Sequence, residues 1–275
     1  MKRFMIVAIL CTSSYFLMAQ EHRLVKIWET DTLLKTPESV LFNAAGKFLY
    51  VSNINGQAAD KDGNGSIGKV GLDGKIIAVD WAKGLNAPKG MGVYKTVLWV
   101  ADIDQVVGIN TTTGAIEKRI NVPGSSFLND ITVDNKGVVY VSDTRGKKVY
   151  AIENGNVTTV QEYLQGPNGL LAVGDDLYIL DNGSLMKLGK DKKLTKVTDG
   201  MESSTDGLEM VDDKDFIASC WVGTIYYIKD DGSKQKLLDT REQKINSADI
   251  GFDPVKKILY VPTFAKNSVA AYALK

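Results

Sequence analysis

Six imperfect copies of one pattern run through this chain and restrict its fold more than any other feature. Each copy contains a short apolar run rich in Val, Ile, Leu and aromatic residues. These runs cover residues 48–51, 97–100, 138–141, 177–179, 216–218 and 258–261. One position precedes each run, and the successive copies of this position are 38 to 51 residues apart. Repeats of this length indicate an array of similar supersecondary units that pack on one another.

Each repeat divides into four strand-like runs separated by turn residues. The third repeat shows this best, with runs at 130–133, 138–142, 149–152 and 157–160. Short runs rich in Val, Ile and Tyr, bounded by Gly, Asn and Asp, are typical of strands joined by hairpins. Helical periodicity is absent beyond residue 19, and four strands per repeat are characteristic of propeller blades. The sequence therefore predicts an all-β fold, a six-bladed β-propeller.

The last repeat, residues 241–275, contains only three strand-like runs. A spare run of suitable length lies at residues 24–28, close to the start of the chain. We expect it to be the fourth strand of the last blade, so that both ends of the chain lie in one sheet. This closure leaves no sheet edge of the ring exposed.

Residues 1–19 have the pattern of a secretory signal peptide. Lys2 and Arg3 precede an apolar stretch, and Ala19 provides a small residue for cleavage before Gln20. We therefore expect a single propeller domain over 20–275, exported to the periplasm or secreted, without a membrane span. A lipoprotein anchored at Cys11 is the weaker alternative, because Ala8-Ile9-Leu10 lacks the small residue normally found just before a lipidated Cys.

Composition excludes several classes of function. Without residues 1–19, 31 basic and 33 acidic residues remain, and this balance gives no reason to expect a nucleic-acid partner. His22 is the only histidine and lies near the N-terminus, so a Ser-His-Asp or Cys-His triad is improbable. A zinc site of His and Cys ligands is excluded for the same reason, since only Cys220 remains in the mature chain. We expect a small-molecule substrate instead.

The recurring position that precedes each apolar run carries the candidate chemistry. In the six repeats it is Glu38, Lys89, Asn129, Asn168, Asp206 and Ala248. Equivalent positions of a closed ring face the same axis, so four oxygen-bearing side chains are expected to converge there. Two carboxylates and two amide oxygens suit Ca²⁺, which prefers six to eight oxygen ligands and would keep open positions for water or substrate. The sequence therefore predicts one calcium ion in the central channel, held by Glu38, Asn129, Asn168 and Asp206.

These residues, within Pro37-Glu38-Ser39-Val40, Asn129-Asp130, Pro167-Asn168-Gly169-Leu170 and Asp206-Gly207, resemble the SMP-30/gluconolactonase-like propellers. The order Glu, Asn, Asn, Asp is also similar to that of diisopropylfluorophosphatase and the paraoxonases. The resemblance spans essentially the whole mature chain. It implies a calcium-dependent hydrolase of a lactone or organophosphate ester, in which the residue matching Asp206 is the general base or nucleophile.

The chain departs from these families at several positions. Phe127 stands where SMP-30 proteins often have an Arg that helps hold a sugar lactone, and no histidine pair is available as in the paraoxonases. Lys89 places an ammonium at the axis. We expect it either to pair with Glu38, the favoured interpretation, or to act as a catalytic electrophile toward a developing oxyanion.

The ends of the second strands return to the level of the axis residues, because the first two strands of each repeat form a hairpin. We predict from this that Asn53, Asp143, Trp221 and Phe264, together with Phe127, bind the substrate. Ordinary turn chemistry is the alternative for Asn53 and Asp143, and Asp102 is a weaker candidate for proton transfer. Trp221 is expected to form a wall of the pocket.

Residues 60–65, Asp-Lys-Asp-Gly-Asn-Gly, resemble the start of a calcium loop. The position where such a loop needs its last acidic ligand is Gly71, so the ligand set is incomplete. Instead of a calcium site, we expect these residues to belong to a long polar loop that shields the channel mouth.

Together these observations predict a calcium-dependent hydrolase of a lactone or related ester. The main alternative is a non-catalytic propeller that binds a ligand or protein, because the fold does not by itself select a function. Lyase chemistry of the strictosidine synthase type is a third and weaker alternative, because no catalytic Glu of that type can be placed.

Overall fold

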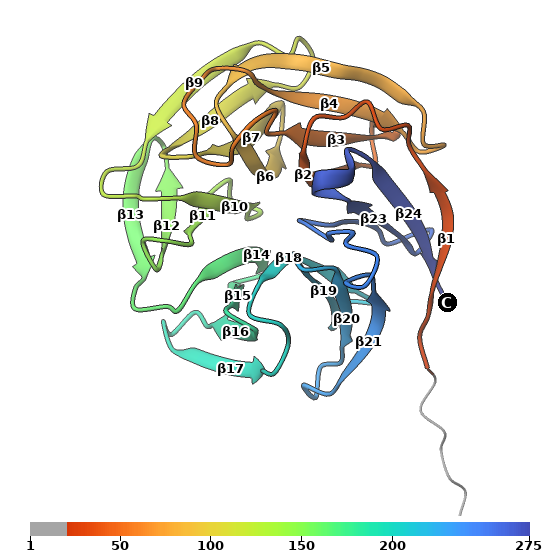
Figure 1. Ribbon diagram of the computed structural model, residues 1–275. Helices are drawn as coiled ribbons and strands as arrows, with labels where there is room; N and C mark the ends of the chain where they lie inside the picture. Colours follow the sequence, from red (N-terminus) through yellow and green to blue (C-terminus); the bar gives the residue numbers. More distant parts are fainter. Residues whose placement is uncertain (1–20) are drawn as a thin grey trace, which may run out of the picture.

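The computed structural model describes residues 21–275, which form six four-stranded antiparallel sheets arranged in a ring (Figure 1). The expected signal peptide lies outside the described residues. Blade 1 consists of β2 (Pro37–Asn43), β3 (Phe48–Asn53), β4 (Gly65–Gly71) and β5 (Ile76–Leu85). Blade 2 consists of β6 (Pro88–Tyr94), β7 (Val97–Asp102), β8 (Gln105–Asn110) and β9 (Ile116–Asn121). Blade 3 consists of β10 (Leu128–Val133), β11 (Val139–Asp143), β12 (Lys148–Glu153) and β13 (Asn156–Gln161).

Blade 4 consists of β14 (Pro167–Val173), β15 (Asp176–Asp181), β16 (Ser184–Leu188) and β17 (Leu194–Thr198). Blade 5 consists of β18 (Thr205–Val211), β19 (Asp215–Cys220), β20 (Thr224–Ile228) and β21 (Lys234–Asp239). Blade 6 consists of β22 (Gly251–Asp253), β23 (Ile258–Pro262), β24 (Val269–Leu274) and β1 (Leu24–Glu29). One short 3₁₀ turn, Phe264–Lys266, follows β23. These sheets confirm the predicted six-bladed propeller.

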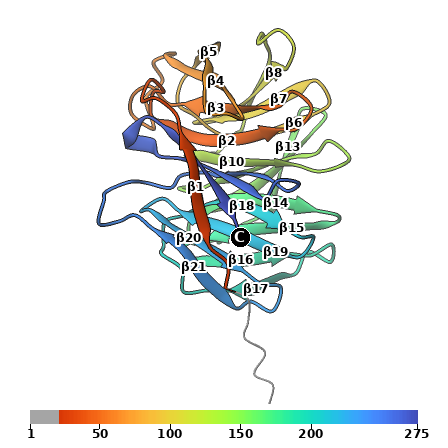
Figure 2. The ribbon, with the colours of Figure 1, turned by 90° about the vertical axis from the view of Figure 1, so that its right-hand side faces the viewer.

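The N-terminal strand closes the ring, as predicted. β1 pairs with β24 from Leu24 opposite Leu274 to Glu29 opposite Ala270, and it is the outermost strand of blade 6. Figure 2 shows β1 running along the side of the molecule beside the C-terminus. Trp28 also reaches blade 1, where its indole N–H donates to the carbonyl of Leu72 at 3.0 Å.

The core lies between adjacent blades, because both faces of each sheet are covered by its neighbours. The middle strands are buried almost throughout, as in β20, whereas outer strands such as β9 are half-exposed. This burial explains why the second and third strands read as apolar runs and the fourth strands as mixed ones. Among the described residues, no helix is long and apolar enough to cross a bilayer.

Candidate functional site

The axis residues sit in irregularities at the start of the first strand of their blades. In blades 1 to 5 the register between the first two strands shifts at this point, for example between Leu128 and Ile131 in blade 3 and between Thr205 and Leu208 in blade 5. A bulge interrupts the alternation of side chains and re-aims the extra residue. Asn129 and Asp206 are therefore directed at the channel mouth instead of into the packing between blades.

Serines of the second strands support these irregularities in three blades. The hydroxyl oxygens of Ser52, Ser142 and Ser219 accept the backbone N–H groups of Ser39, Asp130 and Gly207 at 2.8 to 2.9 Å. Each of these N–H groups belongs to the residue that follows an axis residue. The three serines are positioning residues that the sequence reasoning missed. The signal was present, because each occupies the last but one position of its strand.

The axis residues gather around one cavity of about 380 Å³ at this end of the channel. Its wall includes Glu38, Lys89, Asn129, Asn168 and Asp206. Ala248, the sixth equivalent position, is fully buried and does not line this cavity. The four side chains that the sequence predicted as calcium ligands are thus brought together from four separate blades.

Two oxygen atoms of this group have no hydrogen-bond partner among residues 21–275. Glu38 Oε2 and Asn168 Oδ1 are buried and unpartnered, although both residues line the cavity. The amide nitrogens are occupied: Asn168 Nδ2 donates to Asp206 Oδ1 at 2.9 Å and Asn129 Nδ2 to Thr144 Oγ1 at 3.1 Å. A buried oxygen atom lowers the stability of the fold when neither a hydrogen-bond donor nor a cation contacts it. This arrangement fits a hard cation that accepts carboxylate and amide oxygens.

The carboxyl groups at the channel are poorly solvated. Burial, followed by the charge of Asp206, raises the pKa of Glu38 well above its usual value. Burial and then the charge of Asp249 raise the pKa of Asp206 in the same direction. Both shifts favour a neutral acid in the absence of compensating positive charge. A bound cation would reverse them by stabilising the carboxylates.

Lys89 does not form the expected ion pair with Glu38. Its side chain is only 1% exposed, and its ammonium donates to the carbonyls of Ala58 at 3.0 Å and Ala87 at 2.9 Å. It also lies 4.4 Å from the ring centroid of Phe127. Burial lowers the pKa of Lys89, and the charge of Glu38 opposes this shift. The favoured interpretation of Lys89 is therefore wrong, because two carbonyls and an aromatic face already satisfy the ammonium.

Three aromatic side chains form the outer part of the cavity. Phe127, Trp221 and Phe264, three of the residues predicted to bind substrate, all line it. The rings of Trp221 and Phe264 meet edge to face with centroids 5.5 Å apart. Trp221 remains 41% exposed. The cavity thus combines an acidic, oxygen-rich floor with an aromatic rim.

Asn53 and Asp143, which were also predicted to bind substrate, lie outside this cavity. The Asp143 carboxylate accepts the backbone N–H groups of Ser126 and Phe127 at 2.8 Å. Asn53 Oδ1 accepts the N–H of Lys35 at 3.1 Å, and Asp102 binds the N–H groups of Asn86 and Ala87 in the same way. These side chains hold the segment that leads into the first strand of their blade. Such turn contacts leave their oxygens no access to a ligand in the cavity.

The loop between β3 and β4 reaches the cavity through Ala58, which lines it. Lys61 and Asp104 form an ion pair at 2.5 Å between this loop and blade 2. Asp62 accepts hydrogen bonds from Asn64, as in an ordinary polar turn. Among the described residues, no three His, Cys, Asp or Glu side chains form a group that could hold a metal ion. The predicted quartet at the axis is not of this kind, because two of its four side chains, Asn129 and Asn168, are amides.

A narrower space of about 190 Å³ continues along the channel below the axis residues. Residues of the first strands line it, and the acidic residues of its lining are Asp130, Glu209 and Asp249. The Asp249 carboxylate accepts a hydrogen bond from the Ser39 hydroxyl at 2.5 Å. Burial raises the pKa of Asp249 to about 7 and that of Glu209 to about 8.

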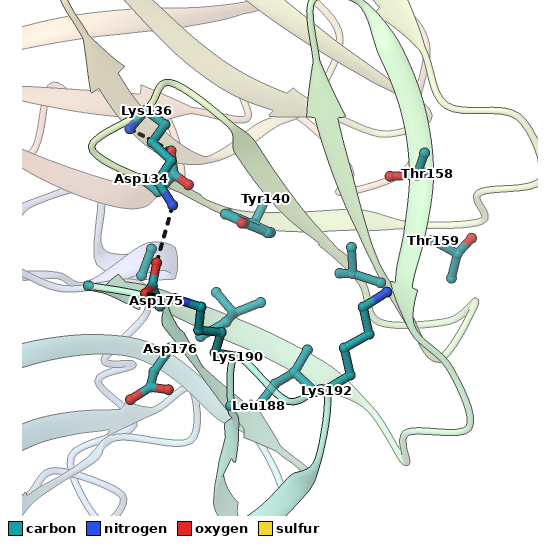
Figure 3. A pocket seen from close by; sticks show the side chains of 15 residues that line it. Asp134, Lys136, Tyr140, Thr158, Thr159, Asp175, Asp176, Leu188, Lys190 and Lys192 are labelled. Atoms are coloured by element: carbon teal, nitrogen blue, oxygen red, sulfur yellow. Dashed lines mark hydrogen bonds and ion pairs between the residues drawn. The ribbon is translucent and has the colours of Figure 1, made fainter.

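A separate pocket of about 560 Å³ lies between blades 3 and 4, at the opposite ends of their first strands (Figure 3). It has an apolar floor that includes Leu177 and Leu188. At its rim Lys136 and Lys190 both pair with Asp175, at 3.2 and 2.9 Å. No residue singled out from the sequence lies there.

The single histidine and the single described cysteine lie away from the candidate chemistry. His22 stacks on Tyr227 with ring centroids 3.9 Å apart. Cys220 is fully buried, and burial raises the pKa of its thiol to about 12. Neither residue lines the cavity.

No protein-family model and no curated protein matches this sequence. Solved structures match its fold across most of the chain. A putative gluconolactonase aligns with a TM-score of 0.69 at 13% identity, covering 92% of each chain. A streptogramin B lyase aligns with a TM-score of 0.67 at 11% identity, covering 93% of this chain and 98% of the lyase. The nidogen/laminin complex contains a chain that aligns with a TM-score of 0.66 at 16% identity, covering 79% of this chain and 84% of that one. At these identities the similarity shows the propeller fold alone.

Proposed function

We propose that this protein is a calcium-dependent hydrolase of a lactone or related ester. The observation that carries the proposal is the pair of buried, unpartnered oxygens, Glu38 Oε2 and Asn168 Oδ1, in a cavity that also contains Asn129 and Asp206. The resemblance of these residues to the SMP-30/gluconolactonase pattern supports it, and the fold of the putative gluconolactonase is consistent with it. Export to the periplasm or outside the cell remains part of this proposal.

Glu38, Asn129, Asn168 and Asp206 would hold the ion. When bound, calcium would polarise the carbonyl oxygen of the substrate and stabilise the negative charge that develops there. The chain itself would supply proton transfer. Asp206 would take a proton from the attacking water, and Asn168 would keep the Asp206 carboxylate oriented through its hydrogen bond to Oδ1.

The proposed reaction adds water across one acyl bond. The water oxygen bonds to the carbonyl carbon, the bond from that carbon to the ring oxygen breaks, and the proton held by Asp206 passes to the departing oxygen. A lactone then gives one hydroxy acid. Lys89 would stabilise the developing oxyanion only through its field, because carbonyls already accept two of its three N–H bonds.

The decisive test is a calorimetric calcium titration of chelator-stripped protein, followed by a lactone and ester screen. We expect one saturable site in the wild type, loss of that site in Asp206→Asn, and hydrolysis reduced at least about 100-fold. Asp212→Asn is the matched control, because Asp212 is an exposed partner of Lys257 on the surface. Full activity of Asp206→Asn would refute the assigned role.

The alternative is a non-catalytic binding propeller, consistent with the fold of the nidogen/laminin complex. Saturable ligand binding without hydrolysis of any lactone or ester would favour it.

Lyase chemistry is less well supported. A virginiamycin B lyase from Staphylococcus aureus in which a histidine is replaced by alanine is catalytically inactive. Its structure aligns with this chain with a TM-score of 0.65 at 13% identity, covering 93% of this chain and 99% of the lyase. The only histidine of this chain lies away from the cavity.

A further inference from the structure

We infer that the cavity selects a substrate with a flat apolar group of about aryl size beside the reacting carbonyl, in place of a polyhydroxylated sugar lactone. The hydrolysis of such a substrate rests on the proposed function, whereas its binding to the cavity does not. It comes from the aromatic rim of the cavity and from the way that rim is held.

The first observation is the wall formed by Trp221 and Phe264. Both rings line the cavity and contact each other edge to face. Phe264 also packs, with Ala58, against the buried cluster of Ile54, Ala87 and Ile103. Trp221 exposes 41% of its surface at this concave position, so a ligand can remove apolar area from water there.

The second observation is the backbone of Phe264, which has a φ of 50°. Large side chains rarely adopt this left-handed region, and such outliers persist only where the surrounding structure imposes them. Here the segment that contains Phe264 is closed by Thr263 and Ser268, because the Thr263 hydroxyl donates to the Ser268 carbonyl at 2.8 Å and accepts the Ser268 N–H at 3.1 Å. The fold thus retains a strained aromatic residue at the cavity rim.

The third observation is Phe127 on the other side of the channel. Phe127 directly precedes blade 3 and Phe264 belongs to blade 6, and these blades are opposite each other in the ring (Figure 1). The Lys89 ammonium and the Arg145 guanidinium lie 4.4 and 4.3 Å from the centroid of the Phe127 ring. These two cation–π contacts orient the ring, so the cavity has aromatic surface on both sides of the axis.

The fourth observation is that the neutral polar side chains outside the axis residues are unevenly distributed around the wall. The Thr144 hydroxyl is occupied, because it donates to the Pro167 carbonyl at 2.7 Å and accepts from Asn129. Apart from the axis residues, the remaining neutral polar side chains come only from the blade 4 and 5 side; they are Asn182, Ser203, Ser204 and Thr205. A sugar lactone would place several hydroxyls against Phe127, Trp221 or Phe264, where they would lose their hydrogen bonds to water.

The experiment compares dihydrocoumarin, an aryl lactone, with gluconolactone. We expect wild-type kcat/KM to favour dihydrocoumarin by at least tenfold. Trp221→Ala should lower kcat/KM for dihydrocoumarin about tenfold and that for gluconolactone less than twofold. The matched control is Tyr163→Ala, which removes a 91% exposed aromatic residue that does not line the cavity and should change neither value.

A binding measurement separates this inference from the proposed function. Saturation-transfer NMR with the ring-opened acid of dihydrocoumarin needs no turnover, and we expect contact that is lost in Trp221→Ala. Binding without hydrolysis would uphold the aromatic subsite and overturn the hydrolase. Preferred hydrolysis of gluconolactone, insensitive to Trp221→Ala, would uphold the hydrolase and overturn the aromatic subsite. Neither binding nor hydrolysis would overturn both.

Discussion

At the scale of single residues, Lys89 shows how close a positive charge can come to a candidate cation site without joining it. The ammonium is held by the carbonyls of Ala58 and Ala87 and by the ring of Phe127. These contacts satisfy its donors but leave its charge near Glu38, whose carboxyl group responds to it. Lys89 should therefore weaken calcium binding while it fastens the loop that contains Ala58 to the rim.

Lys89→Met should have opposite effects on calcium affinity and on stability. Removing the charge should tighten calcium binding about tenfold, because an ammonium in the wall of the same cavity repels a divalent cation. It should also lower the free energy of unfolding by about 1–3 kcal/mol, because two carbonyls lose their donor. Calorimetry and urea unfolding measure the two effects.

The control for this substitution is Lys61→Met, which removes another lysine contact of the same loop. Lys61 pairs with Asp104 at the surface, so this change should leave both values nearly unchanged. Unaltered or weaker calcium binding in Lys89→Met would show that its charge does not reach the site.

At the scale of the elements, the first strands and the residues that lead into them concentrate acidic groups along the channel. Asp249 and Glu209 have pKa values raised to about 7 and about 8 by burial. A raised folded pKa means that the folded state keeps a proton that the unfolded state has already released. Stability should therefore fall as pH rises from the unfolded pKa, near 4, to the folded pKa.

We predict that, in the presence of a chelator, the free energy of unfolding decreases between about pH 5 and about pH 8. Glu209→Gln should make this decrease smaller, because one group no longer titrates. Urea unfolding at several pH values measures it, with the exposed Glu153→Gln as control. A wild-type stability that rises across this window, or an equal decrease in Glu209→Gln, would contradict the burial argument.

At the scale of the whole molecule, the ring depends on a strand taken from the other end of the chain. β1 supplies the outer edge of blade 6, and its Trp28 packs near Tyr260 with ring centroids 5.9 Å apart. The same indole donates to the Leu72 carbonyl of blade 1. Trp28 thus joins the last blade to the first.

Trp28→Ala should lower the free energy of unfolding by about 3 kcal/mol, because a large, partly buried aromatic side chain and one hydrogen bond are lost at the closure. Lys26→Ala, on the same strand but half-exposed, should cost little. Chemical denaturation compares the two. Equal stability of both variants would mean that the closure contributes little to the fold.

The sequence by itself determined the six blades, their closure by the N-terminal strand and the cluster of Glu38, Asn129, Asn168 and Asp206. Alternation of apolar residues and turns is a local property, and a closed ring places equivalent positions at one axis. Only the tertiary structure decided the contacts of Lys89, because its partner Ala58 lies in a loop whose path no pattern specifies. It likewise placed Asn53 and Asp143 outside the cavity and revealed Ser52, Ser142 and Ser219 as supports of the bulges. Such contacts depend on backbone irregularities and on side chains from distant segments, which periodicity does not encode.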